Sequence, residues 1–176
     1  MSAPRILALA LVLAAGPAAG QGATSALRGH NSNAPVDVAA DRIEVQDRAD
    51  RAVFSGNVVV KQGDMTLTAA RLTVAYANSG GIQIQRLDAS GGVTVRSPSE
   101  TARGSFGIYD LNSRLITLVG NVTLTRGESR VNGARLVLDL NSGRAVMDGG
   151  AVAGATADTT ARGGRVTGTF TVPQRN

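Results

Sequence analysis

Few side chains in this sequence could carry out covalent or acid–base chemistry. The chain of 176 residues has no cysteine and one histidine, His30, which lies in a stretch rich in Ser, Asn, Gly and Ala. A nucleophile or general base needs neighbours that activate it, and a lone histidine in such a stretch offers none. One histidine without cysteine also leaves almost no donors for a transition-metal site. The sequence therefore predicts no catalytic residue, no metal and no cofactor.

The charged residues are numerous but are not arranged as a site. Most of the 13 acidic residues fall in turn-like segments, where Asp is favoured for backbone reasons. Lys61 is the only lysine, so 17 of the 18 basic residues are arginine, and the net charge is +5. This charge suits nucleic acid, anionic or phosphorylated headgroups, or simply a solvated surface. Because the arginines are spread along the chain and aromatic residues make up only 3%, we expect no nucleic-acid binding.

The first twenty residues resemble a secretory signal in composition. Arg5 precedes an apolar run at residues 6–15, and small residues around Pro17 follow it. The run is shorter than the ~20 residues that cross a bilayer. We therefore expect residues 1–20 to be a cleaved signal peptide, with an uncleaved anchor as the alternative. Residues 21–35 would then form a flexible lead-in with His30 in solvent.

An internal repeat organises the rest of the chain. The run Asp110-Leu111-Asn112-Ser113 returns 29 residues later, beginning at Asp139. Glycines recur at spacings of 35, 29 and 29 residues, at Gly56, Gly91, Gly120 and Gly149. Turn-type residues separate the β-rich runs at 47–50, 62–64, 78–81, 97–99, 112–113 and 126–128. These signals predict strands joined by tight turns, with a bulge or corner at each glycine and no substantial helix.

Alternation along these strands predicts an antiparallel sheet with one apolar and one polar face. The apolar face is assigned to Ile43, Val45, Val58, Val60, Leu72, Val74, Val93, Val95, Phe106, Ile108, Val122, Leu124, Leu136 and Leu138. Stacked units would enclose an apolar interior between two faces. We expect this domain at residues 36–152, followed by a loose tail at 153–176 that contains a final strand at 165–172.

Several short motifs support a family resemblance. They are Ala-Asp-Arg-Ile-Glu-Val at 40–45, Phe-Ser-Gly-Asn-Val-Val-Val-Lys-Gln-Gly at 54–63, Ala-Ala-Arg-Leu-Thr-Val at 69–74, and the recurring Gly-Asn-Val. With the signal peptide, their order and spacing resemble the OstA-like family of periplasmic lipopolysaccharide transport proteins. The resemblance covers about residues 35–152, with a looser match at 164–173.

The resemblance implies an open, twisted antiparallel β-jellyroll in the periplasm that carries lipopolysaccharide acyl chains inside. It also implies end-to-end stacking of protomers into a bridge from inner-membrane to outer-membrane components, and no catalytic motif. We expect the lipid-binding wall at Val58, Val60, Leu72, Val74, Ile108, Val122, Leu124, Leu136 and Leu138. The strands near 38–45 and 165–172 are the expected docking edges.

Two alternatives remain open at this stage. The apolar residues can form a core without ligand, in a structural β-repeat or filament protein that has no lipid cargo. Arg42, Arg71 and Arg135 recur at similar positions in the unit. They could contact lipid phosphates or pair across strands with Glu44 or Asp139, and we favour the pairing.

Overall fold

The computed structural model describes Leu27 and residues 29–78, 80–150 and 165–170. In these residues every regular element is a β-strand except one short 3-10 helix, η1. The elements are β1 (Asp37–Ala39), β2 (Arg42–Gln46), η1 (Asp47–Ala49), β3 (Arg51–Gln62), β4 (Met65–Asn78), β5 (Ile82–Arg96), β6 (Glu100–Asp110), β7 (Leu115–Arg126), β8 (Ser129–Asp139), β9 (Arg144–Asp148) and β10 (Thr167–Thr169).

The strands form one antiparallel sheet of ten strands, with β3 to β8 paired in sequence order. At one end β1 and β2 both pair with β3, and at the other end β9 and β10 both pair with β8. The first and last strands do not pair with each other, so the sheet stays open. The predicted all-β class, an open antiparallel jellyroll of successive hairpins, is confirmed.

Each long strand changes register near its middle, and these changes fold the sheet along one line. The pairing shifts between Ser55 and Val58, between Ser90 and Val93, and between Val119 and Val122. The predicted bulges lie at the first three glycine landmarks, Gly56, Gly91 and Gly120, whose φ angles are +79°, +82° and +82°. These φ values favour glycine, which has no Cβ to clash. The fourth landmark, Gly149, follows the end of β9 at Asp148.

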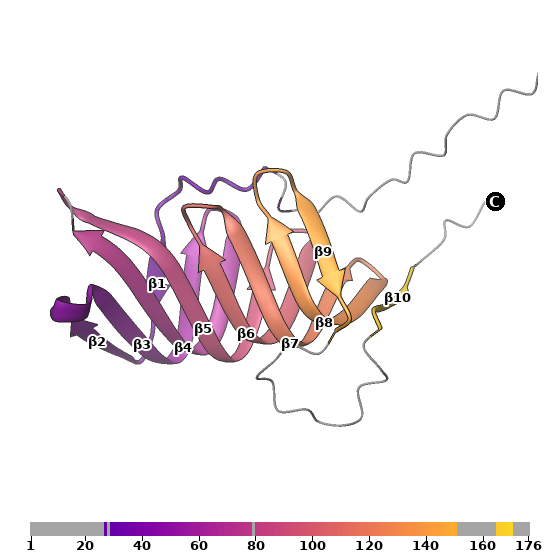
Figure 1. The fold of residues 1–176 in the computed structure, drawn as a ribbon, viewed down its shortest axis with the longest axis horizontal. Coiled ribbons are helices and arrows are strands. Elements are labelled where there is room, and N and C mark those ends of the chain that lie inside the picture. Colours follow the sequence, from indigo (N-terminus) through magenta and orange to yellow (C-terminus); the bar gives the residue numbers. More distant parts are fainter. Residues whose placement is uncertain (1–26, 28, 79, 151–164, 171–176) are drawn as a thin grey trace, which may run out of the picture.

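The fold line divides the sheet into two halves, which meet at the lower edge in Figure 1. In the β1–β10 half, turns at 63–64, 97–99 and 127–128 join the strands. In the β2–β9 half, the strands are joined between Asn78 and Ile82 and by turns at 111–114 and 140–143. Buried side chains from both halves form one hydrophobic cluster, so the core lies between them.

Asp41 carries the chain from one half to the other between β1 and β2. Its N–H donates to the carbonyl oxygen of Gly56 over 2.9 Å. Its carboxylate accepts a hydrogen bond from the side-chain amide of Asn57, also over 2.9 Å. Asp41 therefore holds the entering chain against the first bulge of the sheet.

The turn expected at 47–50 is present as the 3-10 helix η1, and the N–H of Asp50 donates to the carbonyl oxygen of Asp47. Of the final strand expected at 165–172, the structure describes residues 165–170, and in these Thr167–Thr169 pair with β8. The expected signal peptide at 1–20 and the parts of the expected tail at 153–164 and 171–176 lie outside the described residues.

Candidate functional site

Eight of the nine side chains predicted to line the interior lie on its inner face. Seven are almost completely buried, with 0–4% of their surface exposed, and Leu124 is partly buried against the same cluster. The seven are Val58, Val60, Leu72, Val74, Val122, Leu136 and Leu138. Because they come from β3, β4, β7 and β8, they form one apolar layer along the sheet. In this structure their side chains pack as a core.

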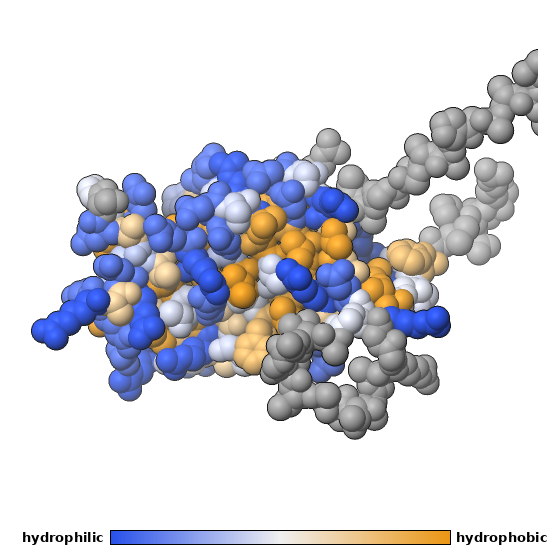
Figure 2. Space-filling view, viewed as in Figure 1, coloured by the Kyte–Doolittle hydropathy of each residue, from blue (hydrophilic) through white to orange (hydrophobic). Residues whose placement is uncertain are grey.

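The face predicted for Ile108 is wrong. Tyr109 is 1% exposed and pairs across the strands with buried Ile116, so Tyr109 points inward and its neighbour Ile108 points outward. Phe106, predicted on the same inner face, is 55% exposed. The alternation pattern gave the wrong face for these residues because the outer face also carries apolar residues. Ile108 shares an outer row with Thr117, Val137 and Val146, and Figure 2 shows apolar side chains gathered over these strands.

Sequence reasoning also missed part of the interior. The buried residues that it did not assign include Met65, Leu67, Leu87, Tyr109, Ile116 and Leu118. A signal for Ile116 and Leu118 was present, since they lie on either side of polar Thr117 at the start of β7.

A buried glutamine at the end of β3 makes four hydrogen bonds. The Gln62 side-chain amide donates to the carbonyl oxygens of Ser32 and Ala34, each over 3.0 Å. Its Oε1 accepts from the Tyr109 hydroxyl over 2.8 Å and lies 3.2 Å from Nε2 of His30. Because Oε1 can only accept, Nε2 of His30 must carry the hydrogen. The other ring nitrogen, Nδ1, is buried without a partner.

These contacts join parts of the fold that are far apart in the sheet. In strand order β4 and β5 lie between β3 and β6, so the Gln62–Tyr109 bond crosses the interior. The same glutamine holds the segment before β1, which we call the N-terminal strap and define as Leu27 with residues 29–36. The predicted solvated position of His30 is therefore wrong, because this part of the expected lead-in packs on the sheet.

The N-terminal strap is tied to both halves of the sheet. Gln62 holds it to the β1–β10 half, and Arg114, in the turn between β6 and β7, donates to Oδ1 of Asn33 over 3.0 Å. Arg114 also donates to Asn141 over 3.2 Å, which links this turn to the turn between β8 and β9. In Figure 1 the strap crosses the fold from the β8–β9 turn towards β1, at the edge opposite the fold line.

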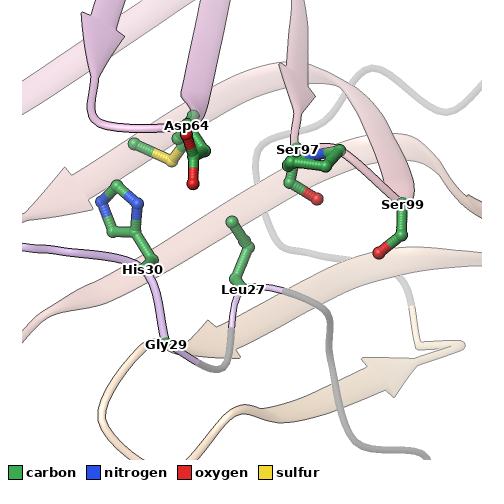
Figure 3. Close-up of a pocket in the computed structure, with 8 residues that line it drawn as sticks. Leu27, Gly29, His30, Asp64, Ser97 and Ser99 are labelled. Atoms are coloured by element: carbon green, nitrogen blue, oxygen red, sulfur yellow. The ribbon is translucent and has the colours of Figure 1, made fainter.

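Leu27 of the strap enters the hydrophobic cluster and is 3% exposed. Beside it is a cavity of about 130 Å³, lined by Leu27, Gly29, His30, Asp64, Met65 and the turn at 97–99. Figure 3 shows Leu27 and His30 facing Asp64, Ser97 and Ser99 across this space. Ligand sites usually measure about 300–1,000 Å³, so this cavity is smaller than a usual ligand site.

Inner-face side chains and strand edges are more exposed at the ends of the sheet than in its middle. Ile43 and Val45 lie on the inner face, in register with Phe54 and Ala52, yet they are 55% and 57% exposed. They are exposed because β2 has a neighbouring strand, β3, on one side only. The same is true of β1, β9 and β10 within the described residues. Backbone groups on the outer edges of these strands can pair with another chain.

The cross-strand pairing predicted for the recurring arginines does not match the observed register. Arg42 and Arg71 both lie opposite Ser55 rather than a glutamate. Arg135 lies opposite Asp148. These three arginines are exposed on the outer face, so they do not contribute to the interior.

Two further observations concern the class of protein. Among the residues that the structure describes, no helix has the length and apolar character needed to cross a membrane. In the same residues, no three His, Cys, Asp or Glu side chains come together as a possible metal site.

Comparisons with known proteins point to one family. The family described as LptA/(LptD N-terminal domain) LPS transport protein matches residues 37–144. An uncharacterized protein of Rhizobium meliloti is 32% identical over 152 residues, which cover 81% of this chain and 82% of that protein. The LPS-assembly protein LptD of Yersinia enterocolitica is 33% identical over 88 residues, 49% of this chain but only 11% of LptD.

A solved structure has the same fold. It is LptH, described as the LptA homologous periplasmic component of the lipopolysaccharide transport device of Pseudomonas aeruginosa. The match has a TM-score of 0.69 and covers 81% of this chain and 99% of LptH, at 19% sequence identity. At this identity the likeness supports the fold, which is the open β-jellyroll expected from the sequence.

Proposed function

Because the chain belongs to the LptA/LptD N-terminal domain family of LPS transport proteins, we propose that it binds lipopolysaccharide and carries it through the periplasm. The lipid's acyl chains would lie between the two halves of the sheet. The observation behind this proposal is the single apolar interior that runs from β3 to β8 and is exposed at its β2 end, where Ile43 and Val45 lie. Binding of this kind is not catalysis, and we propose no enzymatic activity.

The physical basis is the removal of acyl chains from water. Each buried CH₂ contributes about 0.8 kcal/mol, so a few chains of ordinary length supply a large favourable free energy. Valine and leucine walls hold such chains without specific polar geometry. The interior is filled by its own side chains, so we propose that the halves separate along the line of bulges when lipid enters. The turns on the opposite edge would then move apart.

The exposed strand edges supply the proposed partners. A second copy of this chain, or a related domain of a membrane component, would add a strand to β1 and β2 at one end or to β9 and β10 at the other. Because each end has one short strand from each half, both halves would continue into the neighbour. This arrangement would make a bridge from inner-membrane to outer-membrane components with a continuous interior.

Site-specific photo-crosslinking tests the lipid route. A photo-reactive amino acid is placed in turn at Val60, Leu124 and Leu138, and the purified protein is exposed to lipopolysaccharide. Ile108 is the matched control, because it is also aliphatic but lies on the outer face of β6. Thr123, which bonds to Asn132 at the surface, is the polar control.

Adducts at the three interior positions and none at either control would support an internal lipid route. Adducts at Ile108 equal to those at Leu138 would indicate surface adsorption and would contradict the proposal. A folded protein that gives no adducts at any position would favour the alternative, a structural β-repeat protein without lipid cargo.

A further inference from the structure

The N-terminal strap lies where a lipid would enter the interior from the side. It runs between the hairpin turns of the two halves, and it is bonded to Gln62 on one side and to Arg114 on the other. The fold line closes the opposite edge of the sheet. Side entry therefore requires the strap to leave its place.

The strap presents two kinds of group to the fold. One is apolar, because the side chain of Leu27 is buried in the hydrophobic cluster. The other is polar, because the carbonyl oxygens of Ser32 and Ala34 accept hydrogen bonds from the buried amide of Gln62. An acyl chain with its ester or amide carbonyl carries the same two kinds of group.

We propose that the strap occupies the binding position of a ligand acyl chain. We further propose that Gln62 binds the acyl carbonyl of the ligand after the strap is displaced. This inference rests on the proposed function and adds to it a binding residue and a ligand chemistry. The ligand class is a long-chain acyl ester or amide. Leu27 holds the position of acyl carbons, and Gln62 distinguishes a carbonyl-bearing chain from a plain alkyl chain.

The geometry explains why strap and ligand exchange. Gln62 is 1% exposed with the strap in place, and its amide hydrogens both bond to strap carbonyls, so displacement of the strap removes both acceptors. A buried donor without an acceptor is unfavourable, and a carbonyl oxygen of the ligand removes this penalty. The Tyr109 hydroxyl stays bonded to Oε1 and keeps the amide hydrogens directed towards the vacated position. Strap and ligand therefore compete, and the apparent affinity for the ligand falls as the fraction of molecules with a closed strap rises.

A disulfide lock tests the competition directly. A Cβ built at Gly63 lies 4.0 Å from Cβ of Ala34 in the strap, within the usual range of about 3.5–4.5 Å for a disulfide. The native chain has no cysteine, so Ala34→Cys with Gly63→Cys gives one possible bond. Gly63 has a φ of +51°, and the reduced form of the same variant is the matched control for the strain of this substitution.

Binding of fluorescent rough-chemotype lipopolysaccharide is measured for the oxidised and the reduced variant and for the native protein. We expect the oxidised form to bind at least about tenfold more weakly than the reduced form, because the closed strap no longer opens. Reductant should leave the native protein unchanged. Equal binding by both forms would overturn the inference and leave the proposed function standing. Failure of the native protein to bind would overturn the proposed function, and the inference with it.

If the double variant binds poorly even when reduced, Leu27→Ala decides the question. This change loosens the strap without touching Gln62, so we expect about tenfold tighter binding of the same lipopolysaccharide. Binding that is unchanged or weaker in Leu27→Ala would overturn the competition.

The carbonyl preference is tested with two single-chain probes that compete with lipopolysaccharide. N-dodecanoylglucosamine has an amide carbonyl, whereas dodecyl glucoside is joined through a glycosidic oxygen and has no carbonyl group. We expect the native protein to prefer the amide about fivefold, and Gln62→Leu, checked for folding, to lose this preference. The same preference in both proteins would overturn the role of Gln62.

Discussion

Replacing Tyr109 by phenylalanine removes one hydroxyl from the contact that crosses the interior. The ring stays, so no cavity forms, and the change isolates the hydrogen bond to Gln62 at 2.8 Å. Oε1 of Gln62 keeps a second donor in His30 at 3.2 Å, so it is not left without a partner. We therefore expect a loss of about 1 kcal/mol in the free energy of unfolding, rather than the larger cost of an unsatisfied buried group. The melting temperature should fall by about 2–4 °C.

The same hydroxyl should make stability depend on alkaline pH. Burial raises the pKa of Tyr109 above its ordinary value of 10.0. A raised pKa means that the folded state holds the proton more tightly than the unfolded chain. The contribution of the protonated Tyr109 hydroxyl to stability is complete below about pH 10 and is lost as the pH rises through the pKa of the folded state. Tyr109→Phe should therefore lose less stability than the native protein between about pH 9.5 and 11.

Urea denaturation followed by far-UV circular dichroism at several pH values measures both effects. Tyr76→Phe is the matched control, because Tyr76 is the other tyrosine of the chain. Partial burial and the carboxylates of Asp47 and Asp50 raise the pKa of Tyr76 too, so it should contribute to the alkaline slope. Its replacement should leave stability at neutral pH within about 0.5 kcal/mol of the native value. If Tyr109→Phe matches the native protein at neutral and alkaline pH, the cross-interior contact is not made in solution.

Three further predictions concern packing, bulges and edges. Leu72→Ala, at a side chain with 0% exposure, should cost about 2–5 kcal/mol in urea denaturation, and a loss below 1 kcal/mol would indicate a loose interior. Gly120→Ala should cost about 2–3 kcal/mol, because the new Cβ meets Oγ of Ser105 at 2.8 Å and φ is +82°. The control Gly127→Ala, also at positive φ but with open space around it, should cost about 1 kcal/mol, and equal costs would refute the steric argument. Deleting 165–176 should leave circular dichroism unchanged but weaken self-association in analytical ultracentrifugation, and an unchanged association profile would remove β10 from the docking edges.

Much of the fold followed from local signals in the sequence. Glycine at 56, 91 and 120 indicated bulges because the backbone there adopts positive φ, which few other residues tolerate. The inner face of β4 was predictable because Leu72 and Val74 lie on either side of polar Thr73. In β8 the pair Leu136 and Leu138 is flanked by Arg135 and Asp139, although Val137 between them is apolar. The turn residues placed the hairpins, since turn chemistry is specific to a few residue types.

The interior contacts were not predictable because they join distant residues. Nothing near Gln62 indicates that its partner is Tyr109, 47 positions away, or that its other partners lie about 30 positions earlier. The strap was mistaken for a solvated lead-in because its composition is that of a flexible segment. Ile108 was assigned to the wrong face because alternation carries no information where both faces of a strand are apolar.

The pairing of β3 to β8 in sequence order has a consequence for how such a protein changes in evolution. Each repeat of 29 residues, as between Asp110 and Asp139, advances the sheet by one pair of strands. Neighbouring strands lie about 4.8 Å apart, so duplication of one repeat, which adds two strands, lengthens the interior by about 9.6 Å. The end strands would keep their partners within the new first and last hairpins. The span of the molecule can therefore grow by internal duplication of one hairpin, without a new interface at either end.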